Sequence, residues 1–423
     1  MAIVTGIANS LNVMYVDLIE TFSTTRAKAA TVQSCVIGGL GMSGIFTGPC
    51  VSWLGLRRAG LIGVFISSMA LALSFFADSI MYLAVVLGIG TGVGSSFPFI
   101  AAQSAVGKYF DKKSSPIAMS LIMTGGGVGG VVLPYLISYL TTEYGIKGAL
   151  LICGGIEANC LAAFLLVHPD NRTPRQLDDK FTDTNITEME PLNKQQSSEE
   201  KNRQEFQCFV WLHRRVPILF IKRDAILLFK NIPLMCVSLG LSISLIAFYV
   251  VFFIMMDHLK LLGYSDSNGV LIITVTNSVN TVSRLLPGAL KQIPNLGILY
   301  IPIMMTVIGG FCVLAMPFVS DITTLAVLYS LSCGLPFGCQ NSVKPLCLMK
   351  LVDERLFPVV IGASLTVLGV GVVVSGPITG YIEDMSGSYN LAFYISGGTL
   401  LACSTLLTVG LVLHRNENDA SCH

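Results

Sequence analysis

Charged residues are scarce in this 423-residue chain. Only 12% of the residues are Asp, Glu, Lys or Arg, whereas 53% are hydrophobic and the mean hydropathy is +0.71. Soluble domains carry about a quarter charged residues, so this composition is typical of a chain that crosses a membrane several times. The formal net charge is only +1, and without a basic excess we expect no nucleic acid as a partner.

Motifs for metal binding and catalysis are also missing. The twelve cysteines lie mostly singly in apolar stretches, and none forms a CxxC pair or a cysteine–histidine spacing that could hold a metal. We interpret them as small residues that pack between helices. No pair of catalytic carboxylates and no nucleophile with a base can be recognised. We therefore expect no enzyme, no metal site and no cofactor.

The amino-terminal stretch lacks the features of a cleavable signal peptide. The chain opens "MAIVTGIANSLNVMYVDLIETF" and continues into apolar sequence, without a basic leader or a small-residue cleavage site. We expect this stretch to be the first membrane span.

Long apolar segments follow one another along the chain. A helix needs roughly 20 apolar residues to cross about 30 Å of hydrocarbon, and it satisfies its backbone hydrogen bonds internally. Twelve such segments predict an all-α membrane protein with six spans in each half. The segments are 2–22, 31–53, 59–77, 80–106, 116–140 and 148–167, then 231–254, 268–290, 298–318, 322–349, 357–381 and 389–413.

Residues 168–230 have a different composition. Their middle, "DTNITEMEPLNKQQSSEEKNRQE", is polar, carries charges of both signs and holds few apolar residues. Such a segment cannot bury enough apolar surface to fold. We therefore expect an N-terminal six-helix bundle (1–167), a largely disordered linker (168–230), a C-terminal six-helix bundle (231–413) and a short tail (414–423).

The short loops on the linker's side of the predicted bundle carry more Lys and Arg than the loops on the other side. The first group is Arg57, Arg58, Lys108, Lys112, Lys113, Lys291, Lys350 and Arg355; the second is Arg26, Lys28, Lys147 and Lys260. Because short cytosolic loops are enriched in cations, we expect the linker and both termini to lie in the cytosol. We expect a multi-pass protein of the plasma membrane.

The two halves share sequence features in the same order. "DKKSSP" (111–116) and "DERLFP" (353–358) place Asp and Pro five residues apart at the entrance of the fifth and eleventh spans. Further on, a proline and a glycine pair are equally spaced in both halves. These matches indicate a duplicated six-helix unit with parallel repeats, the plan of the major facilitator fold.

Both of these spans are rich in glycine, as "GGGVGG" (125–130) and "LGVGVVVSGP" (368–377) show. Small residues let helices approach closely, which serves either ordinary packing or helix sliding during gating. The candidate gating glycines are Gly125, Gly126, Gly127, Gly129, Gly130, Gly371 and Gly376.

Three stretches carry a family resemblance: "VMYVDLIETF", "VGKYFDKKSSPIAMSLIMTGGGVGG" and "YGIKGALLICGGIEAN". They resemble the proton-linked monocarboxylate transporters of the major facilitator superfamily. The resemblance implies alternating-access transport of small carboxylates, commonly with a proton. It also implies an Ig-like ancillary glycoprotein as a partner for delivery to the cell surface, and membrane lipid as the surroundings.

The sequence departs from this family at three places. The acidic, glycine- and tryptophan-rich signature of the first helix is absent. In the family's eighth helix an Asp precedes the Arg by one turn, whereas here Asn280 precedes Arg284. The family's first-helix Lys corresponds to Asn9. Loss of one acid and one base leaves the net charge of the pocket unchanged.

Arg284 is a permanent cation inside a span, which costs at least ~2.5 to 3.5 kcal/mol on insertion scales. It could reach the interface or pair with an acid such as Glu157, or it could bind a substrate carboxylate with two parallel hydrogen bonds. Asn280, one turn earlier, could bind the same ligand. Asn9 could line the opposite wall or pack between helices.

Four further residues have two interpretations each. Lys344 could supply a second cation or extend its stem toward the interface. Glu157 is the candidate for proton coupling, because it is the buried acid that remains. Phe97 and Tyr249 could shape the pocket or pack in the core.

The sequence therefore predicts a transporter of small monocarboxylates or related organic anions that works by alternating access. We expect weak or absent proton coupling, because Asn280 and Asn9 cannot titrate. Two alternatives remain: a uniporter of aromatic amino acids or similar amphipathic solutes, and a transport-dead membrane scaffold that acts through its linker.

The orientation can be tested at Cys208 in the linker. If residues 168–230 lie in the cytosol, a membrane-impermeant thiol reagent added to intact cells should not label Cys208, and permeabilised cells should be labelled. Labelling of intact cells would reverse the predicted orientation.

Overall fold

The computed structural model describes residues 1–10, 14, 18, 21–22, 26–111, 113–167, 231–293, 297–386 and 388–421. Within these ranges the secondary structure is helical and contains no strand, which confirms the predicted all-α class. The predicted linker lies outside the described residues, as does much of the second part of the predicted first span.

The helices form two series along the chain. The N-terminal half contains α1 (Ala2–Ser10), α3 (Arg26–Met42), α4 (Gly44–Leu54), α5 (Leu56–Leu73), α6 (Ile80–Leu83), α7 (Gly92–Tyr109), α8 (Ser115–Ala158) and α9 (Cys160–Leu165). The C-terminal half contains α13 (Ile232–Leu261), α14 (Asp266–Ser283), α15 (Leu286–Leu290), α16 (Tyr300–Ala315), α17 (Ile322–Tyr329), α18 (Leu335–Leu351), α19 (Phe357–Ser386) and α20 (Asn390–Ser421). The last helix continues through most of the predicted tail.

Nine helices in the described ranges are long and apolar enough to cross a membrane, and a bent pair makes a tenth. One of the nine, Ser115–Leu165, has 51 residues, more than twice the roughly 20 that a span needs. Gly145 divides it, with a φ of 68° that favours glycine. Counted as two spans, this helix raises the number in the described ranges to eleven, while the predicted first span lies only partly within them.

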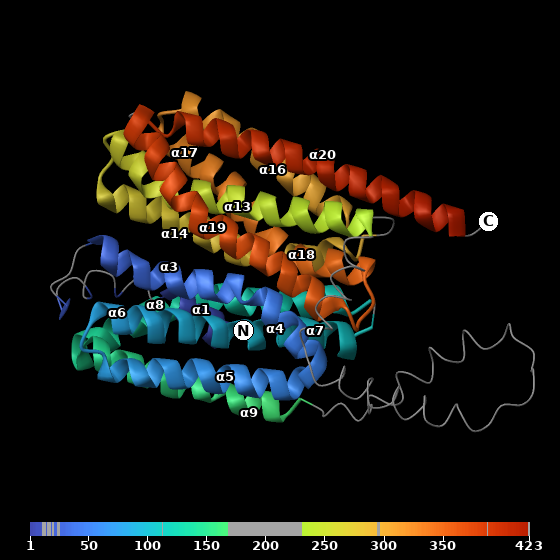
Figure 1. Cartoon of the computed structure of the whole chain (residues 1–423). Coiled ribbons are helices and arrows are strands. Elements are labelled where there is room, and N and C mark those ends of the chain that lie inside the picture. The colour runs from blue at the N-terminus through green and yellow to red at the C-terminus, as the bar shows by residue number, and fades with distance from the viewer. Residues whose placement is uncertain are drawn as a thin grey trace, which may run out of the picture.

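Figure 1 shows the two series as two groups of roughly parallel helices lying side by side. The end of the molecule where α9 ends and α13 begins, at the right of Figure 1, is called the linker end, and the opposite end is called the far end. The carboxyl end of α20 also lies at the linker end.

A structural repeat appears in the fourth and tenth spans. A π-helical turn, Ala84–Thr91, precedes α7, and a second one, Ser330–Gly334, precedes α18. Each of the two following helices carries a Pro-Phe pair, Pro98-Phe99 in α7 and Pro336-Phe337 in α18. π-Helical turns are rare and occur frequently at functional sites. The match supports the duplicated unit that the sequence indicates.

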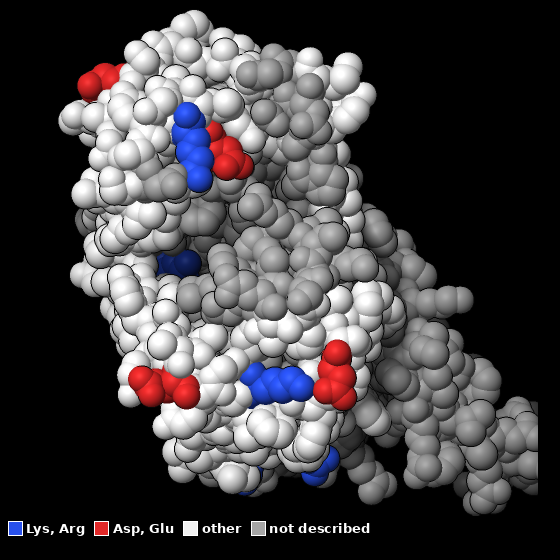
Figure 2. All heavy atoms as spheres, turned by 90° about the vertical axis from the view of Figure 1, so that its left-hand side faces the viewer, with Lys and Arg blue, Asp and Glu red and all other residues white. Residues whose placement is uncertain are grey.

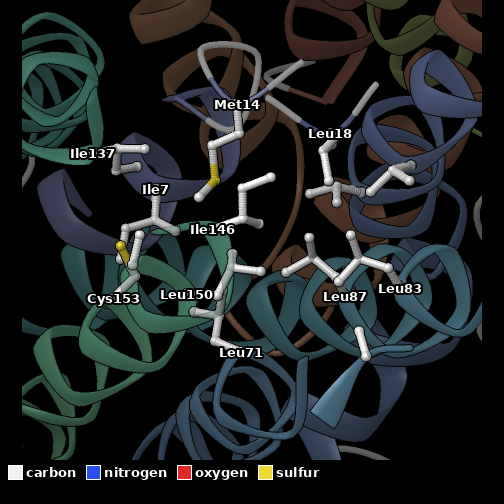
Figure 3. Close-up of a cluster of buried hydrophobic side chains, with 14 of the residues drawn as sticks. Ile7, Met14, Leu18, Leu71, Leu83, Leu87, Ile137, Ile146, Leu150 and Cys153 are labelled. Carbon is white, nitrogen blue, oxygen red and sulfur yellow. The ribbon is translucent and has the colours of Figure 1, made fainter. Parts of the chain in front are cut away.

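Each half has an apolar core of its own. In the N-terminal half, buried side chains from α1, α3, α5, α6, α8 and the π-helical turn pack together, and Figure 3 shows Ile7, Leu71, Leu87 and Leu150 among them. In the C-terminal half, the corresponding cluster surrounds Phe248, Tyr329 and Phe393. Each half is therefore held together by contacts that need not change when the halves move.

Polar side chains begin several helices. Ser79, Asn231 and Asp321 each accept a hydrogen bond from the backbone N–H three residues later, at 3.2, 3.0 and 2.9 Å, the usual arrangement of an N-cap. The hydrogen bonds from the N–H and the hydroxyl of Thr324 hold the pKa of Asp321 below its usual value.

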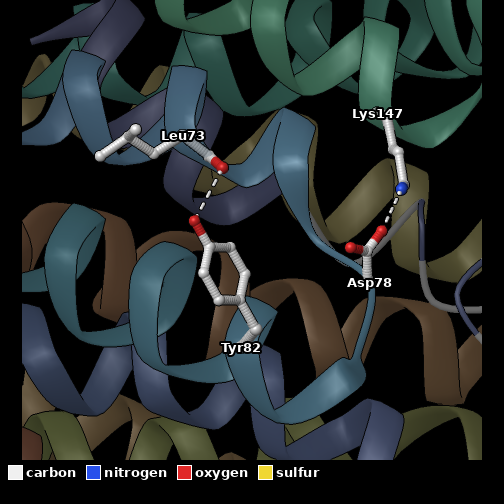
Figure 4. A network of polar contacts seen from close by, with 4 residues as sticks. All are labelled: Leu73, Asp78, Tyr82 and Lys147. Carbon is white, nitrogen blue, oxygen red and sulfur yellow. Dashed lines mark hydrogen bonds and ion pairs between the residues drawn. The ribbon is translucent and has the colours of Figure 1, made fainter.

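At the far end of the N-terminal half, polar contacts join neighbouring loops and helices. Figure 4 shows the ion pair of Lys147 and Asp78, with 3.2 Å between Nζ and Oδ1, and the hydrogen bond from the Tyr82 hydroxyl to the Leu73 carbonyl. The Asp78 side chain is 95% exposed, so the ion pair contributes little to stability.

Glycines bring the two halves together along α3, α4 and α19. A Cβ on Gly369 would lie 2.6 Å from Gly41 Cα, and a Cβ on Gly44 would collide with the Gly362 carbonyl. Gly48 meets the backbone of Pro358 in the same way. These contacts, called here the glycine seam, run from the middle of the bundle to the linker end.

Hydrogen bonds strengthen the glycine seam. The helix pair bends by 51° between α3 and α4, and the N–H of Ile45 just after the bend donates to the Thr366 hydroxyl at 2.8 Å. The Ser52 hydroxyl donates to the Arg355 carbonyl at 3.0 Å. A backbone group released by the bend is thus satisfied by the other half, as a membrane interior requires.

A second pair of helices closes the same end. Gly288 of α15 packs on Ile117 and Ser120 of α8, and its N–H donates to the Ser120 hydroxyl at 3.0 Å. Met349 of α18 approaches Gly107 of α7. The two halves therefore meet closely at the linker end.

The candidate gating glycines have different surroundings. A Cβ on Gly127 would lie 3.0 Å from Thr281 of the other half, while Gly129 packs against the backbone of Ala2 and Gly371 against Ile246. Gly125 has only distant neighbours, Gly130 has none within 4 Å, Gly126 lies near Arg284, and the surroundings of Gly376 are not described. The glycines of the seam were not among the candidates.

The seam can be tested with one methyl group. Gly44→Ala should separate α4 from α19, because the added Cβ meets backbone that cannot rotate away. We expect less cross-linking between cysteines introduced at positions 52 and 355 by a short bifunctional thiol reagent, relative to each single-cysteine variant.

Gly130→Ala is the matched control, because a Cβ at Gly130 has open space and Ala is the better helix former by about 0.5–1 kcal/mol. It should leave cross-linking unchanged. Equal loss in both variants would show that helix distortion, not the seam, controls the distance.

Candidate functional site

Arg284 follows α14 and connects the two halves. Its Nη1 donates to the carbonyl of Met123 in α8 at 2.9 Å. Gly126, one turn further along α8, leaves room for the guanidinium, since a Cβ there would lie 3.6 Å from Nη1. The side chain is partly exposed, so it is neither sealed in the core nor extended toward the linker end.

Asn280 holds the guanidinium from one turn earlier. Its Oδ1 accepts hydrogen bonds from Nε at 3.3 Å and from Nη2 at 3.1 Å, while its Nδ2 donates to the Cys333 carbonyl at 3.2 Å. The Asn280 side chain is 7% exposed. Asn280 therefore orients Arg284, and both the oxygen and the nitrogen of its amide are hydrogen-bonded.

Two N–H groups of Arg284 remain available. A guanidinium has five N–H donors, and the three hydrogen bonds to Met123 and Asn280 use three of them. The structure gives the other two no acceptor in the part of the chain that it describes. Figure 2, which views the far end, shows a hollow between the halves with a basic side chain recessed in it.

One candidate aromatic residue lies within electrostatic range of Arg284. Tyr249 of α13 interacts electrostatically with Arg284. Its ring packs edge-on against Phe337, with 4.8 Å between the centroids, and lies 5.8 Å from Phe253. Phe97 instead packs against Gly63 of α5 within the N-terminal half. Of the two candidate aromatic residues, Tyr249 is brought to Arg284.

Lys344 lies inside the C-terminal half. It is 5% exposed, and its Nζ donates to the Ser242 hydroxyl at 3.2 Å and to the Ser364 carbonyl at 3.3 Å. Ser242 belongs to α13 and Ser364 to α19. The structure thus separates Lys344 from the residues that hold Arg284, and it places the ammonium in the core, not at the interface.

Glu157 lies inside the N-terminal half. Its side chain is fully buried, its Oε1 accepts a hydrogen bond from Ser67 at 2.6 Å, and its Oε2 has no described partner. Arg284 and Glu157 do not pair with each other, since each has other partners in the described structure. The remaining candidate, Asn9, belongs to α1, and its side chain lies outside what is described.

Sequence reasoning missed the glycine seam, Thr366 and the role of Met123. Gly41, Gly44 and Gly48, and likewise Gly362, Thr366 and Gly369, follow the pattern of small residues three or four positions apart, which is typical of close helix pairs in membranes. This pattern could have identified both helices. It could not have shown that they pack against each other.

Comparison with known proteins agrees with the fold. The model of the Major Facilitator Superfamily matches residues 1–375. Among curated proteins, mouse monocarboxylate transporter 2 is 24% identical over 95% of this chain and 79% of its own length, and monocarboxylate transporter 9 of Pongo abelii is 26% identical over 93% and 87%. Rat monocarboxylate transporter 10 is 26% identical over 93% and 72%.

Solved structures show the same architecture. The transporter FucP in the outward conformation has a TM-score of 0.64 at 15% identity, covering 97% of this chain and 96% of its own. The proton:xylose symporter XylE has a TM-score of 0.62 at 14% identity, covering 96% and 92%. These findings confirm the predicted fold and the resemblance to monocarboxylate transporters. The chain belongs to the Major Facilitator Superfamily and is a multi-pass membrane transport protein.

Proposed function

We propose that this protein carries small monocarboxylates or related organic anions across the plasma membrane by alternating access. The observation that carries the proposal is Arg284, which is bonded to both halves and retains two free N–H groups. Planar guanidinium groups bind carboxylates with two parallel hydrogen bonds. Arg284 is the residue that recognises the cargo.

Asn280 supports this role because its side chain carries no negative charge. An Asp at this position would neutralise Arg284, whereas the amide orients the guanidinium without cancelling its charge. The carboxylate of the cargo then supplies the missing negative charge. Because the fork is already oriented by Asn280 and Met123, binding loses little side-chain entropy.

The contacts between the halves suggest how binding connects to movement. The glycine seam and the contact of Gly288 with α8 close the linker end, while the hollow in Figure 2 opens at the far end. With the linker in the cytosol, this arrangement is the outward-facing state. Opening the linker end requires α8 and α14 to separate, and that movement changes the Met123–Arg284 contact. Cargo at Arg284 therefore has different contacts in the two states, which is the condition for shifting their populations.

The localisation and partners follow the same proposal. We place residues 1–167 and 231–413 as two moving bundles in the lipid, with 168–230 and both termini in the cytosol. An Ig-like ancillary glycoprotein remains a proposed partner for delivery to the plasma membrane, on the similarity to monocarboxylate transporters.

The aromatic side chains favour a second candidate function. Tyr249, within electrostatic range of the guanidinium, forms an apolar surface with its neighbours Phe337 and Phe253. A carboxylate with an aromatic side group, such as an aromatic amino acid, could place its charge on Arg284 and its ring on this surface. Competition of lactate uptake by phenylalanine and tyrosine would separate this candidate from the first.

The role of Arg284 can be tested by Arg284→Lys. The ammonium keeps the charge but loses the planar fork, so we expect uptake of radiolabelled lactate and pyruvate to fall by roughly tenfold or more, as expected for losing a charged hydrogen bond of about 1.5–3 kcal/mol. Surface biotinylation should change little.

Arg58→Lys is the matched control, because Arg58 is exposed at the start of α5, and it should leave uptake and surface amount unchanged. Parallel loss of uptake and surface protein in Arg284→Lys would indicate a structural role. Absence of uptake of any carboxylate by the unmodified protein, despite normal surface delivery, would favour the scaffold.

Proton coupling should be weak, because neither Asn280 nor the cation beside it exchanges a proton during transport. We expect uptake to change little as the external pH falls from about 7.5 to about 6, the range to which proton-carrying carboxyls are tuned, beyond the change caused by cargo protonation. Asn280→Asp should introduce a pH dependence, since an acid then lies at hydrogen-bonding distance from Arg284.

Glu157→Gln tests the other route. Steep acid stimulation of the unmodified protein that this substitution abolishes would place proton coupling in the sixth span and contradict the proposal of weak coupling.

A further inference from the structure

Lys344 is a buried cation whose described partners are all neutral. It donates to a serine hydroxyl and to a backbone carbonyl, and no carboxylate of the described chain pairs with it. Removing an ammonium from water costs several kcal/mol unless an opposite charge compensates. An ammonium has three donors, and the two hydrogen bonds leave one N–H without an acceptor.

The side chains around Lys344 also have unused polar atoms. The Ser364 hydroxyl has no partner although the residue is 1% exposed. Gln340, one turn before Lys344, donates to the Ser244 hydroxyl at 2.6 Å, but its Oε1 is unpartnered and the residue is fully buried. Buried polar groups in native proteins are nearly always satisfied. One N–H of Lys344 and the O–H of Ser364 are therefore donors without an acceptor among the described residues. The Oε1 of Gln340 is an acceptor without a donor there.

The position of Lys344 separates it from the Arg284 site. Lys344 donates hydrogen bonds to residues of α13 and α19, whereas Arg284 donates to Met123 of α8 and to Asn280 of α14. Lys344 lies seven residues before the end of α18, and Ser364 lies seven residues after the start of α19, which places both about 10 Å from the linker end at 1.5 Å per residue.

The position of Lys344 is also separated from the glycine seam. Ser364 lies between Gly362 and Thr366, which both contact the N-terminal half. Two residues correspond to about 200° around a helix, so Ser364 lies on the opposite face of α19.

We propose that Lys344, with the Ser364 hydroxyl and Ser242, forms a second anion site inside the C-terminal half. The site takes a small monovalent anion, either chloride or the carboxylate of the cargo. The anion completes the hydrogen bonds of Lys344 and neutralises its charge. Only the carboxylate version rests on the proposed function.

The experiment uses the full chain purified in lipid nanodiscs. Thermal unfolding is followed while sodium chloride, sodium formate or the sodium salt of a bulky sulfonate is titrated at constant ionic strength. A specific anion should raise the midpoint in a saturable way, because a ligand of the folded state stabilises it. The bulky sulfonate should not.

Three variants locate the site. Lys344→Gln should abolish the anion-dependent shift, while Lys350→Gln, exposed on the same helix, should keep it. Ser364→Ala removes a hydroxyl that has no partner, so folding should be unaffected and the apparent anion affinity should fall severalfold. This variant decides the result if Lys344→Gln does not fold.

Arg284→Gln distinguishes the two sites and should retain the shift. A shift with chloride alone identifies chloride, and a shift with formate identifies a carboxylate. The proposal is overturned if neither anion stabilises the protein, if Ser364→Ala binds anions normally, or if Arg284→Gln removes the shift. If the unmodified protein shows the shift but takes up no lactate, only the proposed function is contradicted.

Discussion

A guanidinium that cannot lose its proton has to find acceptors inside a bundle built for lipid. Arg284 finds them in a backbone carbonyl of one half and a side-chain amide of the other. The cation therefore belongs to neither half alone, and its surroundings depend on how the halves are placed. A rigid salt bridge within one half would have removed this dependence, and with it the reason for an anion to enter.

Hydrogen bonding of the backbone imposes a second condition on the same interface. A membrane helix can bend only where another group satisfies the released N–H or carbonyl. Thr366 does this for Ile45 across the glycine seam, so the bend between α3 and α4 is complete only when α19 is in contact. The closed linker end thus combines backbone-to-backbone packing with a hydrogen bond that each half lacks alone. Both are lost together when the end opens, which makes an intermediate, half-open seam unfavourable.

The sequence shows which properties of this fold are local. Span length, the linker composition and the Arg284–Asn280 spacing depend on neighbouring residues, and the helices and that pair were predicted from them. The partners of Lys344 come from helices about 20 and 100 residues away, so no local pattern contains them. Phe97 and Tyr249 looked alike in sequence, yet only Tyr249 lies beside Arg284, because helix rotation decides which face meets the other half. The first-helix residue Asn9 stays a prediction.

The distribution of ionisable groups follows from these constraints. Glu157 is enclosed in the N-terminal half with Ser67, and Lys344 is enclosed in the C-terminal half with Ser242, while Arg284 lies where the halves meet. Glu157 and Lys344 therefore lie in separate cores, and neither neutralises the charge of the other. Electrostatic attraction in a low-dielectric interior is strong at short range. The C-terminal half with its two cations consequently favours anions, and the neutral amide of Asn280 leaves the charge of Arg284 uncancelled.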